Sequence, residues 1–136
     1  MIAGGRASVF RAKEGAEDDA RAGTAAVRAL SRGDVVIGIA ASGITPFVRA
    51  ALGAARRRGC RTVLVTSGRP ARGAADITVA PQVGPEVLTG STRLKAGTAA
   101  KLALNALTTA AMIRLHKVYD HWMVDLKPTS RKLLLR

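Results

Sequence analysis

The sequence predicts an α/β fold in which helices cover a mainly parallel sheet. Three short apolar runs rich in β-branched residues, each bounded by turn signals, favour buried strands over helices. A helical segment separates the first two runs, and a long helical pattern follows the third. The three runs span 34–41, 61–67 and 76–83. A chain of 136 residues forms one domain at most.

The segments before and after the first run set the order of elements. Residues 6–31 carry a short helical pattern that the acidic stretch "EGAEDD" interrupts. The run 34–41 is apolar on both faces, so we expect it to lie inside the sheet. Thr45 can then cap a helix that Pro46 opens and Gly59 ends.

A long helix is predicted over 92–117, after a third strand that Pro81 ends. Its apolar residues recur at spacings of three and four, which predicts one buried face. These residues are Ala100, Leu104, Leu107, Ala111 and Leu115. We expect 1–117 to form an α/β core and 118–136 a C-terminal extension of a single domain.

The charge and composition disfavour several classes of protein. The net charge is +13, but the basic residues are scattered apart from Arg56 to Arg58, and only 3% of residues are aromatic. Nucleic-acid binding therefore rests on charge alone. No apolar run reaches membrane-spanning length, so no membrane partner is expected. The single cysteine, Cys60, excludes an internal disulfide and fits a cytoplasmic protein.

The stretch "ASGITP" lies at the predicted carboxyl end of the first strand, where α/β sheets bind ligands. Ser42 and Thr45 carry hydroxyl donors, and Gly43 would let a ligand approach the backbone. The following helix N-terminus favours an anion. The alternative is that Thr45 only caps the helix and Gly43 only makes the turn, and the residues alone leave both open.

A second candidate loop is "TGSTRLKAGTAAK", where Ser91 and Thr92 precede the long helix. Arg93 and Lys95 lie in its predicted first turn, where cations oppose the helix dipole. That conflict suggests an anion or an acidic partner. The alternative is that both cations extend into water at small cost.

The acidic stretch at 14–19 is the third candidate, because a carboxylate beside a pocket can act as acid or base. A solvated acidic run is the reading that the residues alone favour. His116 and His121 have no acidic or cysteine companions at metal spacing, so no metal site is expected.

Three segments, in this order and spacing, resemble the N-acetylmuramic acid 6-phosphate etherases. They are "GIAASGITPFV", "VGPEVLTGSTRLKAGTAAKLALN" and "KVYDHWMVDLKPTSRKL", and "IAGG" and "EGAEDD" fit the same family. The resemblance covers nearly the whole chain. It implies a layered helix–sheet–helix fold of the sugar isomerase (SIS) type, related to the glucokinase regulatory protein, which binds sugar phosphate without catalysis.

The resemblance implies a cytoplasmic, homodimeric lyase of cell-wall amino sugar recycling. Such enzymes cleave the D-lactyl ether of N-acetylmuramic acid 6-phosphate to N-acetylglucosamine 6-phosphate and D-lactate, without metal or organic cofactor. Glu17 matches one of the two active-site glutamates and is the candidate acid or base. Two ligand loops are implied to bind the sugar phosphate, comprising Ser42, Gly43, Thr45, Ser91, Thr92 and Lys95.

The chain departs from the family pattern in ways that keep a second function open. Ile44 stands where the family usually has arginine, and "SGRPARGAA" differs from the usual loop. The family's first strand, its glycine-rich phosphate loop and its other glutamate are expected to precede Met1, and a helical region is expected to follow Arg136. For the chain taken alone, these departures favour a non-catalytic sugar-phosphate binding module or a degenerate remnant.

Overall fold

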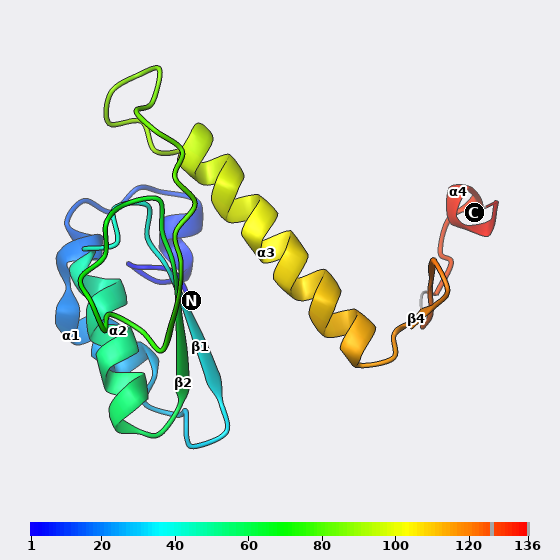
Figure 1. The fold of residues 1–136 in the computed structure, drawn as a ribbon, viewed down its shortest axis with the longest axis horizontal. Helices are drawn as coiled ribbons and strands as arrows, with labels where there is room; N and C mark the ends of the chain where they lie inside the picture. The colour runs from blue at the N-terminus through cyan, green and yellow to red at the C-terminus, as the bar shows by residue number, and fades with distance from the viewer. Residues whose placement is uncertain (126, 136) are drawn as a thin grey trace. The chain divides into compact units, whose positions relative to one another are not determined.

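The computed structural model describes residues 1–125 and 127–135. The chain divides into two compact units, Met1–Ala103 and Leu104–Arg136. The first unit carries the sheet and its covering helices (Figure 1). All the candidate site residues belong to this first unit.

The sheet has three parallel strands in the order β1-β2-β3. They are β1 Val35–Ile39, β2 Arg61–Val65 and β3 Ile77–Val79. Gly38 of β1 pairs with Leu64 of β2, so the carboxyl ends of the two strands lie side by side. The structure confirms the predicted α/β fold with a parallel sheet, and it confirms all three strands, although each is shorter than its apolar run.

Helices occupy the segments between and around the strands. They are the 3₁₀ helices η1 Arg6–Val9 and η2 Ala16–Asp18, and the α-helices α1 Ala20–Ala26, α2 Pro46–Arg57 and α3 Lys95–Arg114. The structure confirms Pro46 as the first residue of α2, and Gly59 follows its end with a φ of 79°.

The core lies where α1 and α2 pack together and α2 packs on β1 and β2 (Figure 1). Its buried side chains are small or aliphatic: Val27, Ala51, Leu52, Ala54, Ala55, Cys60 and Leu64. A glycine permits the close approach of α2 to β1, because a Cβ on Gly38 would lie 2.7 Å from Val48 Cγ1. This small-residue core agrees with a composition poor in aromatics.

A carboxylate fixes the start of β3 against β2. Asp76 Oδ2 accepts hydrogen bonds from the backbone N–H of Thr62 at 2.8 Å and from its hydroxyl at 2.9 Å. The pKa of Asp76 is lowered, first by the Thr62 backbone hydrogen bond, then by the Thr62 hydroxyl, and further by Arg61 and Arg56. Asp76 therefore stays ionised in neutral solution and holds the strand order at the amino end of the sheet.

The prediction that the apolar run 34–41 lies inside the sheet is wrong. Among the described residues, β1 pairs with β2 alone and forms an edge of the sheet, while β2 takes the centre. Val35 is 59% exposed and Ile39 is 47% exposed. An apolar run reports a preference for burial, but strand order depends on pairing with distant segments, which the run does not encode.

The buried face expected for the long helix is also wrong. Leu107 is 37% exposed and Leu115 is 64% exposed, and among the described parts of α3 only Ala96, near its start, is buried. Periodicity shows which face a helix could bury, but burial needs an opposing surface. Exposed apolar positions of this kind mark a surface that favours contact with another apolar surface.

The second unit contains the end of α3 and a short antiparallel pair, β4 Val118–Tyr119 and β5 Trp122–Met123. Lys117 and Asp125 form an ion pair beside this hairpin, and α4 Arg131–Leu134 follows. None of the helices in the described residues has the length and apolar character needed to cross a bilayer.

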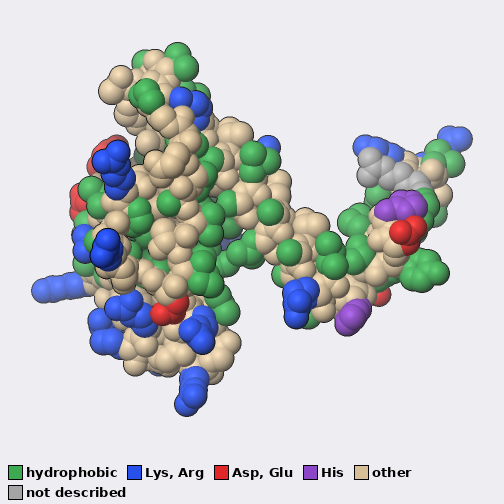
Figure 2. Space-filling model, viewed as in Figure 1, with side chains coloured by type: hydrophobic (Ala, Val, Ile, Leu, Met, Phe, Trp, Pro, Cys, Tyr) green, Lys and Arg blue, Asp and Glu red, His purple; other side chains and the backbone are tan. Residues whose placement is uncertain are grey.

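On the face drawn in Figure 2, Lys and Arg side chains are spread over the first unit, with far fewer Asp and Glu.

Candidate functional site

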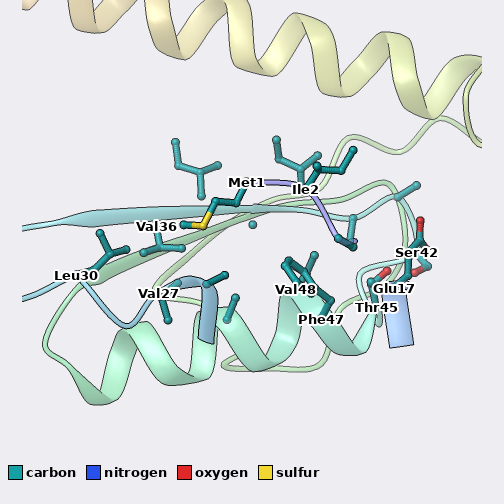
Figure 3. Close-up of a pocket in the computed structure, with 18 of the residues that line it drawn as sticks. Met1, Ile2, Glu17, Val27, Leu30, Val36, Ser42, Thr45, Phe47 and Val48 are labelled. Carbon is teal, nitrogen blue, oxygen red and sulfur yellow. The ribbon is translucent and has the colours of Figure 1, made fainter. Parts of the chain in front are cut away.

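A cavity of about 570 Å³ runs beside β1, between this strand and the helices α1 and α2. Most of its lining is apolar and comes from β1 and from residues such as Val27, Leu30 and Phe47. At one end the lining becomes polar, and Figure 3 shows Glu17, Ser42 and Thr45 gathered there. We call this the polar end of the cavity, and it contains three of the residues that the sequence singled out.

Glu17 reaches the polar end from η2, in the middle of the acidic stretch. The preceding Ala16 is buried and anchors η2, while the Glu17 side chain is exposed. Gly15 lets the chain enter η2 because its φ is 71°, a left-handed conformation that favours glycine. Glu17 is therefore a carboxylate on a fixed turn with access to a ligand.

Ser42 and Thr45 follow the carboxyl end of β1 and line the same end of the cavity as Glu17. The Ser42 Oγ accepts a hydrogen bond from the Ile44 N–H at 3.3 Å, which leaves its own proton free to donate. Thr45 occupies the N-cap position as predicted, but its side chain makes no capping hydrogen bond there. The alternative in which "SGIT" is only a capped turn therefore loses its main support.

Gly43 lies in this turn but does not line the cavity. It is buried with a φ of 74°, and a Cβ there would lie 2.9 Å from Thr66 Oγ1. The Thr66 hydroxyl donates to the Ala41 carbonyl at 3.1 Å and accepts from the Gly68 N–H at 3.1 Å. Thr66 was not among the predicted site residues, although its hydroxyl directly follows the buried strand β2.

The second loop contributes only Thr92 to this cavity. Thr92 also lines a smaller cavity of about 140 Å³ at the carboxyl ends of β1 and β2. Ser91 and Lys95 line neither of these two cavities. The structure thus brings Glu17, Ser42, Thr45 and Thr92 together, and it leaves Ser91 and the Lys95 side chain apart from them.

The start of α3 already has an anionic partner within the chain. Glu86 accepts hydrogen bonds from the backbone N–H of Lys95 at 3.0 Å and of Ala96 at 2.9 Å, one on each carboxylate oxygen. The pKa of Glu86 is lowered, first by the Ala96 backbone hydrogen bond, then by the Lys95 backbone and charge. The acidic partner that the cations at this helix start suggested is therefore Glu86, which was not among the predicted site residues.

The polar end combines groups that suit a hydroxylated, acidic ligand. The hydroxyls of Ser42 and Thr45 can donate to oxygen atoms of a ligand, and they stand before the N-terminus of α2, which favours an anion. Glu17 supplies a carboxylate that can accept a proton. The apolar length of the cavity offers nothing to a sugar phosphate, so we place the candidate site at the polar end.

The chain is similar to proteins of two kinds. Residues 1–56 match the family model of the glucokinase regulatory protein N-terminal SIS domain. An N-acetylmuramic acid 6-phosphate etherase of Symbiobacterium thermophilum is 57% identical over 98% of this chain and 45% of its own length. Etherases of Mesorhizobium japonicum and Pectobacterium atrosepticum are 52% and 51% identical over the whole chain and 46% of their own lengths. The chain thus spans less than half the length of these relatives.

Proposed function

Because this chain belongs to the N-acetylmuramic acid 6-phosphate etherase family, we propose that it forms part of a lyase for the D-lactyl ether of N-acetylmuramic acid 6-phosphate. The products are N-acetylglucosamine 6-phosphate and D-lactate. The observation that carries the proposal is the polar end of the cavity, where Glu17 lies with two hydroxyl residues at the carboxyl end of β1.

The proposed reaction begins on the open-chain sugar, whose aldehyde makes the proton at carbon 2 acidic. A carboxylate base removes this proton, the bond from carbon 3 to the ether oxygen breaks, and lactate leaves as it takes up a proton. Water then adds to the resulting carbon 2–carbon 3 double bond, with its hydroxyl on carbon 3 and a proton returned to carbon 2. Glu17 is the candidate base, since it is the one carboxylate among the described residues lining this cavity.

Ser42 and Thr45 are the candidate binding residues for sugar phosphate. Their hydroxyls are not committed to capping α2, so both can turn toward a ligand. Thr92 lines the same cavity and is a third candidate. Gly43, Ser91 and Lys95 belong to the same two loops. They do not line the cavity, so we propose only a supporting role for them.

A binding module without catalysis is the second candidate function. The match to the regulatory-protein SIS domain covers residues 1–56, which include Glu17, Ser42 and Thr45. Both candidates place a sugar phosphate in the same site, and they differ only in whether Glu17 removes a proton. In either case we propose that the protein acts in the cytoplasm, because phosphorylated sugars are retained there.

Ligand-dependent stability tests the proposed site. At ten times its dissociation constant, N-acetylglucosamine 6-phosphate should raise the free energy of unfolding by about 1.4 kcal/mol, as mass action requires. Ser42→Ala combined with Thr45→Ala should remove this gain while changing the ligand-free stability little, since neither hydroxyl caps the helix. Urea unfolding with and without ligand measures both effects.

Ser130→Ala is the matched control, because Ser130 also carries a hydroxyl at the N-cap of a helix without capping it, and it belongs to the second unit. It should keep the ligand-induced gain. A double variant that still responds fully to the sugar phosphate, or a wild type that does not respond, would contradict the proposed site.

We also propose that the chain self-associates as a dimer through the edge of β1. This edge has no partner among the described residues, and Val35 is 59% exposed on it. Unpaired strand edges favour pairing with a second chain, and a charged residue on the edge opposes it. The wild type should therefore sediment as a dimer at micromolar concentration, and Val35→Lys should sediment as a monomer.

Val87→Lys is the control for this prediction, because Val87 is 94% exposed in a loop away from the sheet edge. It should remain dimeric. A monomeric wild type would refute the dimer, and a dimer that Val35→Lys leaves intact would refute the role of the β1 edge.

A further inference from the structure

Glu86 precedes Lys95 by nine residues, and the loop between them leads into α3. The Glu86 carboxylate accepts a hydrogen bond from the Lys95 N–H and so closes this loop into a ring. Inside the ring the loop makes its own backbone bonds: the Ser91 N–H donates to Leu88 O at 3.0 Å, and the Thr92 N–H donates to Gly90 O at 3.1 Å. The loop is closed at its base by the two bonds from Lys95 and Ala96.

Side-chain burial does not hold this loop in place. Val87 is 94% exposed and Leu88 is 67% exposed, and residues 89–90 and 92–95 are exposed as well. Apolar packing therefore contributes little to fixing its position. The charge-assisted bonds of Glu86 are the stronger restraint on where the loop starts and ends.

One residue of the loop links the ring to the candidate site. Thr92 lines the large cavity beside β1 and the small cavity at the carboxyl ends of β1 and β2. Its carbonyl accepts the Gly97 N–H at 2.9 Å, directly after the two amides that Glu86 binds. The position of Thr92 thus depends on the first turn of α3, which the Glu86 carboxylate completes.

We infer that Glu86 is a positioning residue that holds Thr92 at the candidate site by closing the start of α3. The inference rests on the proposed function and deepens it, because it assigns the α3 N-terminus to the protein's own carboxylate and not to the ligand phosphate. Glu86 does not line the large cavity, and both of its oxygens accept backbone N–H groups, so it does not serve as the base.

Amide hydrogen exchange on the 136-residue chain tests the inference without any ligand. In Glu86→Ala, the amides of Lys95, Ala96 and Gly97 should exchange about tenfold faster, the factor that corresponds to 1.4 kcal/mol. The amides of Val63 to Val65 in β2 should keep their rates. Glu86→Gln retains one acceptor oxygen and should give an intermediate increase, which provides a second variant if the alanine variant folds poorly.

Binding supplies the second readout. The affinity for N-acetylglucosamine 6-phosphate should fall about tenfold in Glu86→Ala and less in Glu86→Gln. Asp120→Asn removes a negative charge in the second unit and should change neither the exchange nor the affinity.

The outcomes separate this inference from the proposed function. Unchanged exchange at Gly97, or an equal increase at Val63 to Val65, would overturn the positioning role, as would faster local exchange with full affinity. If the wild type did not bind the sugar phosphate, the proposed function would fail. Local exchange at Gly97 would still decide whether Glu86 positions Thr92.

Discussion

Replacing Glu17 by glutamine is expected to lower the rate at which deuterium enters carbon 2 of N-acetylglucosamine 6-phosphate by about 10²–10⁴-fold. The glutamine keeps the size and the hydrogen-bonding oxygen of the side chain but cannot accept a proton at neutral pH. Because the exchange needs only the base, it isolates the role of Glu17 from the later breaking of the ether bond. Proton NMR in heavy water measures the rate.

The same variant should keep the affinity for the sugar phosphate within about twofold, since Ser42 and Thr45 remain. Asp18→Asn is its matched control, because Asp18 belongs to the same η2 turn but does not line the cavity. It should retain both exchange and affinity. Exchange that persists in Glu17→Gln would exclude Glu17 as the base.

This experiment also separates the two candidate functions. A lyase requires that the wild type exchange the proton at carbon 2. A binding module gives ligand stabilisation without exchange, whichever residue stands at position 17.

Two helical glycines are expected to respond in opposite directions to alanine. In Gly23→Ala, the new Cβ would lie 2.1 Å from the carbonyl oxygen of Phe47, a backbone atom that cannot rotate away. Helix α1 must then move from α2, which should lower the free energy of unfolding by about 3 kcal/mol. In Gly53→Ala the nearest atom is 3.6 Å away, at the mobile end of Arg57, so the variant should gain about 0.5–1 kcal/mol.

Urea unfolding of the two variants measures this contrast directly. Gly23→Ala should also weaken sugar-phosphate binding, because Phe47 lies in the first turn of α2 and lines the cavity. Equal unfolding midpoints for the two variants would contradict the close packing of α1 on α2.

Local signals predicted the elements of this fold well. Pro46 and Gly59 gave the limits of α2 nearly to the residue, and the apolar runs located the three strands. Each of these signals acts over a few residues through backbone conformation or burial. The edge position of β1 and the exposure of α3 could not be predicted in this way, because both depend on surfaces far away in the sequence.

The candidate site was predictable in part for the same reason. The position of Ser42 and Thr45 after a strand, and the family resemblance of the acidic stretch, indicated three residues that the structure gathers in one cavity. Glu86 went unnoticed, since its partners lie nine and ten residues further along the chain. The cations at the start of α3 pointed to an anion, and only the structure identifies it as this carboxylate.

An amide NMR titration of the 136-residue chain with N-acetylglucosamine 6-phosphate tests most directly whether the polar end of the cavity binds a sugar phosphate. The largest shift changes should occur at Glu17, Ser42, Thr45, Phe47 and Thr92, around the polar end of the cavity. The largest changes at Arg56 to Arg58, where the basic residues of the sequence cluster, would indicate unspecific phosphate binding. That result, or a spectrum that does not change, would contradict a sugar-phosphate site at the polar end of the cavity.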